Sequence, residues 1–93
     1  MDMLTDSQVT GALKELPGWR RNGKLLEKRY DVSGFKAVMT FAMTIGELAE
    51  RADHHPDLLL QYGHVTVMLT THDANGITVK DVALARQIEA ASQ

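Results

Sequence analysis

The chain has 93 residues, enough for one small domain with a modest hydrophobic core, so we expect a single domain over residues 1–93. Ten Lys and Arg against twelve Asp and Glu give a net charge of −2, and no basic stretch predicts nucleic-acid binding. The absence of cysteine excludes disulfides, thiol nucleophiles and thiolate metal sites. The acidic amino terminus is unlike a signal peptide, and no segment approaches the ~20 apolar residues of a membrane span. We expect a cytoplasmic protein without a membrane partner.

The first predicted helix begins at a capping box. Thr5 is followed three residues later by Gln8, a spacing that lets each side chain accept a backbone N–H of the other residue. Apolar residues then recur at helical spacing at Val9, Ala12, Leu13 and Leu16. We expect Pro17 to stop this helix, because a proline disfavours helical conformation in the residue before it.

A β-hairpin is predicted next. Trp19 begins a short strand, the Asn22–Gly23 pair indicates a tight turn, and a second strand covers residues 25–30. We expect Trp19 to lie in the core or in the wall of a pocket. One face of the second strand carries Leu26, Lys28 and Tyr30.

A longer helix is predicted from about Gly34 to about Ala52. At ~100° per residue, its apolar face collects Phe35, Val38, Ala42, Ile45, Ala49 and Ala52. The face is widened by Met39, Met43 and Gly46 on one side and by Phe41 and Leu48 on the other. This arc is wider than packing on one sheet requires, so either the other helices cover it or another subunit does. We expect a homodimer or homotetramer.

The second half of the chain predicts another hairpin and a helix. An apolar run at residues 58–60 and a bend at Tyr62–Gly63 precede a strongly alternating strand at residues 64–71. Residues 78–81 form a second capping box, and a third helix follows. The order α-β-β-α-β-β-α predicts an α+β fold with a four-stranded antiparallel sheet and three helices packed on one face.

Titratable side chains concentrate where the long helix is expected to end. Residues 50–56 read Glu-Arg-Ala-Asp-His-His-Pro, and His72 follows the last strand. Because the last two strands run antiparallel, the hairpin should return His72 to the neighbourhood of His54 and His55. Asp81, in the first turn of the last helix, lies close behind His72 in sequence. We therefore expect imidazoles and carboxylates to gather at one end of the sheet.

Three roles are open to this cluster. Histidines accept and donate protons near neutral pH, so they can act as general acids and bases with a carboxylate orienting one ring. Three histidines and a carboxylate also form a plausible metal-ligand set, although the helical HExxH spacing is absent. Alternatively the rings are structural, since a histidine at a helix C-terminus caps carbonyls and offsets the helix dipole. The capping box alone also accounts for Asp81.

The spaced residues resemble the signature of the pterin-4a-carbinolamine dehydratase family. They are Glu50, His54-His55-Pro56, Tyr62, His72 and Asp81, and residues 16–19 and 71–76 are similar to that family as well. The resemblance covers nearly the whole chain. It implies the same α+β fold and the dehydration of 4a-hydroxytetrahydrobiopterin to quinonoid dihydropterin and water in tetrahydrobiopterin recycling. It implies a pterin as the small-molecule partner and neither a metal nor an organic cofactor.

By that resemblance, the catalytic residues are His54, His72 and His55, of which the first two exchange protons and His55 also helps to bind the pterin. The remaining substrate-binding residues implied are Glu50, Pro56, Tyr62 and Asp81. Many relatives carry an aromatic residue where this chain has Leu58 and Leu59, a departure that concerns substrate packing. The alternative is a non-catalytic pterin-binding or protein-interaction module, since animal members also act as a dimerisation cofactor for a homeodomain transcription factor. These residues neither support nor exclude that role.

Overall fold

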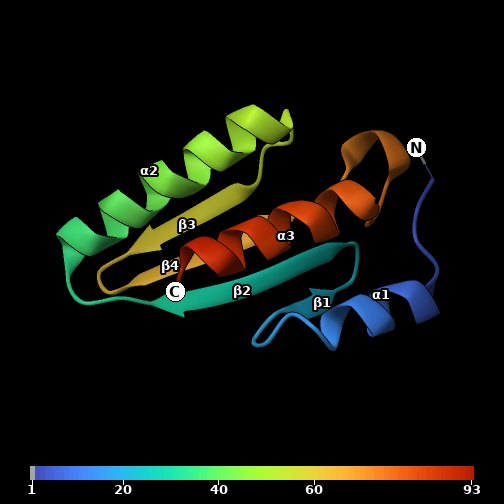
Figure 1. Cartoon of the computed structure of the whole chain (residues 1–93), viewed down its shortest axis with the longest axis horizontal. Coiled ribbons are helices and arrows are strands. Elements are labelled where there is room, and N and C mark those ends of the chain that lie inside the picture. The colour runs from blue at the N-terminus through green and yellow to red at the C-terminus, as the bar shows by residue number, and fades with distance from the viewer. Residues whose placement is uncertain (1) are drawn as a thin grey trace.

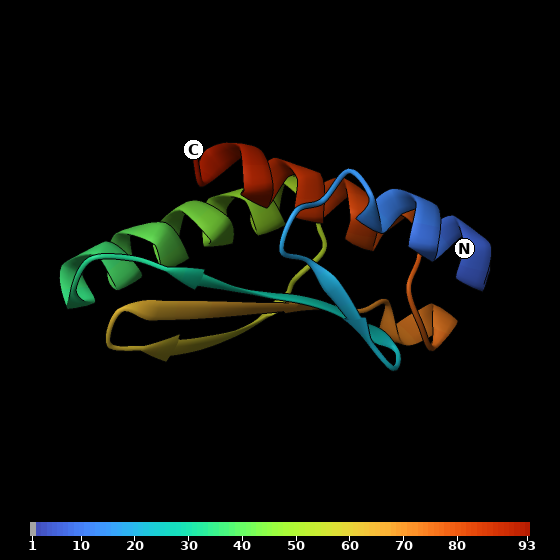
Figure 2. The ribbon, with the colours of Figure 1, turned by 90° about the horizontal axis from the view of Figure 1, so that it is seen from below.

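The computed structural model describes residues 2–93, and Met1 of the predicted domain lies outside them. The elements are α1 (Asp6–Leu13), β1 (Arg20–Asn22), β2 (Leu25–Asp31), α2 (Phe35–Ala52), β3 (Asp57–Gln61), β4 (His64–Leu69), the short 3-10 helix η1 (His72–Ala74) and α3 (Val79–Ala91). The strands form one antiparallel sheet in the order β1-β2-β4-β3 (Figure 1). All three α-helices lie on one face of it (Figure 2). The predicted α+β architecture is confirmed.

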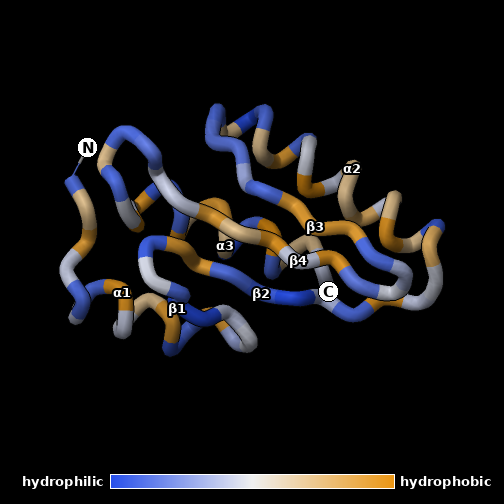
Figure 3. The backbone as a smooth tube through the Cα atoms, turned by 180° about the vertical axis from the view of Figure 1, so that it is seen from behind, coloured by the Kyte–Doolittle hydropathy of each residue, from blue (hydrophilic) through white to orange (hydrophobic). Residues whose placement is uncertain are grey.

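The two hairpins join side by side through β2 and β4. Leu26 lies opposite Leu69, and Tyr30 lies opposite Val65. The apolar residues of β4 that were expected to face the helices, Val65, Val67 and Leu69, are fully buried. In Figure 3 apolar segments recur along β3, β4 and α2.

Within residues 2–93, no helix is long and apolar enough to cross a membrane.

The first helix is shorter than predicted. Both capping-box hydrogen bonds of Thr5 and Gln8 are present, but α1 ends at Leu13 rather than at Pro17. The chain continues in tighter turns, in which the N–H of Leu16 donates to the carbonyl of Leu13 at 3.1 Å. Such three-residue bonds commonly satisfy the last carbonyls of a helix. Leu16, which lies in these tighter turns, is buried and only 1% exposed.

The buried face of α2 is narrower than the predicted apolar face. Val38, Ile45 and Ala49 are buried, and Phe41 and Leu48 on one flank are packed against the core. The two ends of the predicted face, Phe35 and Ala52, are exposed instead. The buried side of α2 is therefore shifted toward Phe41 and Leu48. The opposite flank leaves an exposed apolar stripe at four-residue spacing, which comprises Phe35, Met39 and Met43.

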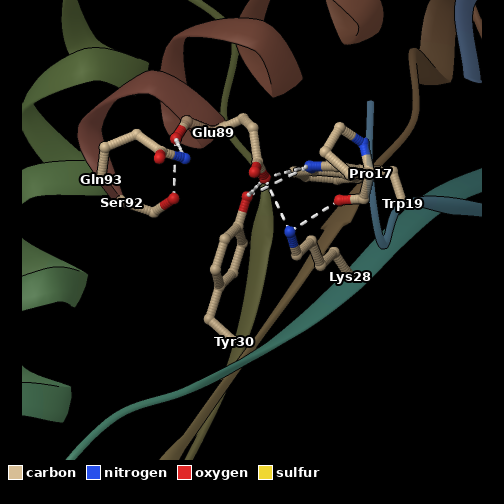
Figure 4. Close-up of polar contacts among 7 residues, drawn as sticks. All are labelled: Pro17, Trp19, Lys28, Tyr30, Glu89, Ser92 and Gln93. Carbon is tan, nitrogen blue, oxygen red and sulfur yellow. Dashed lines mark hydrogen bonds and ion pairs between the residues drawn. The ribbon is translucent and has the colours of Figure 1, made fainter. Parts of the chain in front are cut away.

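A polar cluster ties α3 to the sheet (Figure 4). The Glu89 carboxylate accepts hydrogen bonds from Lys28 Nζ at 2.8 Å, from the Tyr30 hydroxyl at 2.7 Å and from Trp19 Nε1 at 3.3 Å. Burial, reinforced by the hydrogen bond to Glu89 and its charge, raises the pKa of Tyr30 above its usual range. Trp19 is buried, in agreement with the core position expected for it. The cluster fixes the C-terminal half of α3 against β2.

Candidate active site

His54 is placed by the way in which α2 ends. Asp53 adopts the left-handed conformation, with φ 49° and ψ 43°, and reverses the chain direction after the last helical turn. The N–H of His54 then donates to the carbonyl of Ala49 at 3.1 Å, which satisfies one of the terminal carbonyls of the helix. The helix end therefore directs His54 back toward the body of the protein, and its side chain is only 11% exposed.

His72 is placed by a closed loop after β4. Thr71 and Gly76 exchange both backbone hydrogen bonds, at 2.9 and 3.3 Å, and these bonds close the loop that contains η1. Asn75 completes the loop in the left-handed conformation, with φ 58°. His72 is the first residue of η1 and is exposed.

The three histidines expected at the end of the sheet line one cavity of about 340 Å3. His54 and His55 reach it from the end of α2, and His72 reaches it from η1. The antiparallel pairing of β3 with β4 returns the chain to this end, as the hairpin geometry predicted. The complete lining comprises Asp53, His54, His55, Thr70, Thr71, His72, Asp73 and Lys80.

Asp81 lies beneath the cavity and contacts His54. Its Oδ1 is 2.5 Å from His54 Nε2, and the carboxylate is fully buried. Its Oδ2 accepts the N–H of Thr78 and the hydroxyl of Thr71, each at 2.8 Å. The capping box predicted at residues 78–81 is therefore present, but it accounts for only one of the two carboxylate oxygens. Asp81 has no exposed surface and does not line the cavity, but it contacts two residues that do, His54 and Thr71.

A second carboxylate–histidine pair lies at the surface. Glu50 Oε2 contacts His55 Nε2, and both side chains are largely exposed, at 76% and 59%. Glu50 belongs to the last turn of α2 and does not line the histidine cavity. Its contact with the cavity lining is the one with His55, just as Asp81 contacts the lining residue His54.

Two predicted substrate-binding residues lie apart from this cavity. Pro56 is half-buried between His55 and β3, and it is not part of the lining. Tyr62 is 77% exposed in the turn between β3 and β4, with its hydroxyl beside Gly34 at the start of α2. The five residues of β3 lie between the two positions, which are therefore roughly 20 Å apart at about 3.3 Å per residue.

The sequence did not indicate several lining residues. Lys80 lies in the first turn of α3, next to Asp81, and brings a cation to the histidines. Thr71 was placed at the end of a strand and in a segment similar to the family, but no contact with Asp81 was predicted, and the structure shows its hydroxyl bonded to that carboxylate. The position of Lys80 follows from the capping box, which fixes where α3 begins. The contact of Thr71 depends on the loop closure at Gly76, for which the sequence carries no separate signal.

The structure contains a larger groove with different chemistry. It measures about 650 Å3 and lies between α2, the end of β2 and the C-terminal end of α3, with Lys36 and Phe41 among its lining residues. It contains no histidine, and its only carboxylate is Asp31. In residues 2–93, no group of three or more His, Cys, Asp and Glu side chains is arranged to hold a metal ion. Of these two hollows, the smaller one is lined by histidines, the side chains suited to proton transfer near neutral pH.

Comparison with known proteins gives consistent matches over almost the whole chain. The sequence model described as Pterin 4 alpha carbinolamine dehydratase matches residues 2–91. A protein of Thermomicrobium roseum, named provisionally as a pterin-4-alpha-carbinolamine dehydratase, is 44% identical over 88 residues that cover 95% of each chain. A protein of Nocardia farcinica with the same provisional name is 40% identical over 88 residues, which cover 95% of this chain and 93% of that protein.

Solved structures match as well. The crystal structure of a transcriptional coactivator/pterin dehydratase from Brucella melitensis superimposes with a TM-score of 0.94 at 31% identity, covering 99% of this chain and 100% of the other. A pterin dehydratase-like protein described as a RuBisCO assembly factor of the α-carboxysome shares the fold, with a TM-score of 0.69 at 22% identity over 81% of this chain and 89% of its own. The sequence match over residues 2–91 and the relatives at 40% identity or more show that this chain belongs to the pterin 4 alpha carbinolamine dehydratase family.

Proposed function

We propose that this protein dehydrates 4a-hydroxytetrahydropterins, with 4a-hydroxytetrahydrobiopterin of tetrahydrobiopterin recycling as the representative substrate, to quinonoid dihydropterin and water. The observation that carries the proposal is the convergence of His54, His55 and His72 on one cavity, with His54 held by a buried carboxylate. Membership of the family supports the same reaction.

The reaction needs two proton transfers and no change of oxidation state. The bond between C4a and its hydroxyl oxygen breaks as that oxygen receives a proton and leaves as water. The lone pair of the adjacent ring nitrogen forms the new C=N double bond, and a ring N–H proton is lost to a base. Two imidazoles of opposite protonation supply both steps, each typically contributing ~10²–10⁴-fold. We assign these steps to His54 and His72.

The remaining site residues are assigned to binding and orientation. His55 and Lys80 line the cavity and present polar groups to the pterin, while Glu50 orients His55 from the surface. Asp81 orients His54 from below the cavity. Pro56 and Tyr62 lie away from the lining, so within one chain we assign them no contact with the substrate.

The proposal includes self-association. Phe35, Met39 and Met43 form the exposed apolar stripe on α2 and are 53, 44 and 65% exposed. Contiguous exposed apolar surface is typical of protein contacts. A homodimer or homotetramer would cover it. The reaction itself requires neither nucleic acid nor a membrane, in keeping with a cytoplasmic enzyme.

A second candidate function is a non-catalytic pterin-binding or protein-interaction module, including a transcription coregulator. The name of the Brucella melitensis protein combines coactivator and dehydratase. In this chain, the apolar stripe and the uncovered face of the sheet offer surfaces for a protein partner. Binding of a pterin without turnover would favour this candidate.

The two candidates are separated by a rate measurement on synthetic 4a-hydroxytetrahydropterin. Because this compound also dehydrates spontaneously, the wild-type rate is measured against buffer alone and against His72→Ala at the same protein concentration. The dehydratase predicts a wild-type rate above the spontaneous one. The binding module predicts the spontaneous rate together with measurable pterin binding.

A further inference from the structure

We propose that Thr71 is a positioning residue that, through Asp81, holds His54 with its proton on Nε2 and leaves Nδ1 as the His54 atom that meets the substrate. The proposal rests on the proposed dehydratase function for its kinetic consequence. Its structural part concerns the free protein alone.

The hydroxyl groups near Asp81 form a chain whose direction can be derived. Thr71 Oγ1 lies 2.8 Å from Asp81 Oδ2 and 2.8 Å from Thr78 Oγ1. An ionised carboxylate only accepts, and a hydroxyl has a single hydrogen to donate. Thr71 therefore donates to Asp81, and Thr78 must donate to Thr71. The oxygen of Thr78 in turn accepts the backbone N–H of Lys80 at 3.2 Å.

This chain fixes the carboxylate of Asp81. Oδ2 accepts two donors, the Thr71 hydroxyl and the Thr78 N–H, within a fully buried environment. Because both donors of Oδ2 come from the protein interior, Oδ1 keeps one orientation, which is toward His54. A buried hydrogen-bond network with every member satisfied is rigid and specific. Within residues 2–93, every buried side-chain nitrogen and oxygen has a partner.

The tautomer of His54 follows from Asp81. A carboxylate accepts hydrogen bonds and has no hydrogen to give. The hydrogen between Oδ1 and Nε2, which are 2.5 Å apart, therefore comes from the imidazole. In the neutral ring this leaves Nδ1 as the acceptor.

Nδ1 of His54 is accessible from outside the protein. It has no hydrogen-bond partner among the described residues, and none of their buried polar side-chain atoms lacks a partner, so Nδ1 lies on accessible surface. His54 lines the histidine cavity. A proton taken from the pterin would therefore arrive at Nδ1, and the resulting imidazolium would keep its Nε2 hydrogen bond to Asp81.

The test combines nitrogen NMR with kinetics on matched variants. Histidine 15N shifts in the wild-type protein, assigned by comparison with His54→Gln, report which ring nitrogen carries the proton. Thr71→Val removes the hydroxyl at nearly constant volume, whereas Thr71→Ser retains it. Thr66→Val, in β4 with its side chain on the open sheet face, is a control for loss of a threonine hydroxyl elsewhere. Thermal melting verifies that each variant is folded.

We expect the Nε2–H tautomer of His54 in the wild type and in Thr71→Ser, and a loss of that preference in Thr71→Val. The kcat of Thr71→Val should fall by up to about a hundredfold, the size associated with a misplaced catalytic group, with little change in KM. Thr71→Ser should restore kcat. A wild-type His54 protonated on Nδ1, or a folded Thr71→Val with unchanged tautomer and kcat, overturns the inference. Wild-type protein with the Nε2–H tautomer but no dehydratase activity instead overturns the proposed function and leaves the structural part standing.

Discussion

His54 and His72 line the same cavity but have different surroundings. His54 is 11% exposed and contacts the buried carboxylate of Asp81, whereas His72 is exposed on η1 and has no side-chain hydrogen bond within residues 2–93. One histidine is part of the folded interior, and the other is presented to the cavity by a loop. Their replacement should therefore affect stability differently.

The first prediction concerns that difference. His54→Ala leaves Asp81 Oδ1 buried without its partner, and an unsatisfied buried acceptor costs ~1–3 kcal/mol in the free energy of unfolding. His72→Ala removes an exposed ring and should change that free energy by less than about 0.5 kcal/mol. Urea denaturation of both variants and the wild type measures the two values. Equal destabilisation by the two substitutions would contradict the contact between His54 and Asp81.

The second prediction concerns Glu50. Its contact with His55 is at the surface, where an ion pair contributes about 0–1 kcal/mol to stability. Glu50→Gln should leave the melting temperature nearly unchanged and raise KM more than it lowers kcat, because Glu50 is assigned to orienting His55 in substrate binding. Glu47→Gln, one turn earlier on α2 and paired with Arg51 at 3.9 Å, is the matched control. A fall in kcat at constant KM would reject this role for Glu50.

The third prediction concerns acid stability and Glu89. Burial acts to raise the pKa of Glu89, but hydrogen bonds from Lys28 and Tyr30 and the charge of Lys28 outweigh it, so the pKa lies below its usual value. A lowered pKa in the folded state stabilises the protein above the ordinary glutamate pKa of about 4.3, and this stabilisation is lost as pH falls through the folded-state pKa. At neutral pH, Glu89→Gln should cost ~1–3 kcal/mol.

The measurement is the free energy of unfolding as a function of pH. The difference between wild type and Glu89→Gln should narrow on acidification below the ordinary glutamate pKa. Glu15→Gln serves as the control, because Glu15 is 73% exposed and pairs with Arg86 at 3.4 Å. If the difference in the free energy of unfolding stays constant as the pH falls below the ordinary glutamate pKa, Glu89 contributes by packing and not by its charge.

The fourth prediction concerns the apolar stripe. We expect a second copy of the chain to cover the apolar stripe of α2. Met39→Lys combined with Met43→Lys would place two cations in that contact and should shift the equilibrium from the oligomer toward the monomer. Analytical ultracentrifugation at micromolar concentration measures the masses of wild type and variant. Thr10→Lys, on the exposed surface of α1, controls for added charge. A monomeric wild-type protein across this range would exclude self-association through α2.

The sequence predicted the parts of the fold that depend on periodicity and capping. The alternation at residues 64–71 identified the buried face of β4, and the capping boxes at Thr5 and Thr78 marked the starts of α1 and α3. The predicted end of α1 was wrong. Pro17 sets the furthest point that the helix can reach, but it does not make the helix extend that far. The core covers only part of the predicted apolar face of α2, and helical spacing does not tell which apolar flank meets the core.

The sequence predicted that three histidines gather at one end of the sheet, and these residues line one cavity. Antiparallel hairpin geometry was sufficient to bring His72 back to His54 and His55. Spacing did not show that Asp81 pairs with His54, since its capping role was sufficient to account for it. The family resemblance grouped Tyr62 with the site, although β3 carries it toward the other end of the sheet. These outcomes depend on side-chain direction and strand length, which a motif does not encode.

The decisive experiment for the proposed dehydratase function is the initial rate at which synthetic 4a-hydroxytetrahydropterin is dehydrated, measured with wild type, with His72→Ala and with buffer alone. His72→Ala is the preferred variant because the loss of an exposed ring leaves the fold intact. A dehydratase should give a wild-type rate clearly above the spontaneous one and a decrease of ~10²–10⁴-fold in kcat for His72→Ala. If wild type and His72→Ala both give only the spontaneous rate, the proposed dehydratase function is wrong.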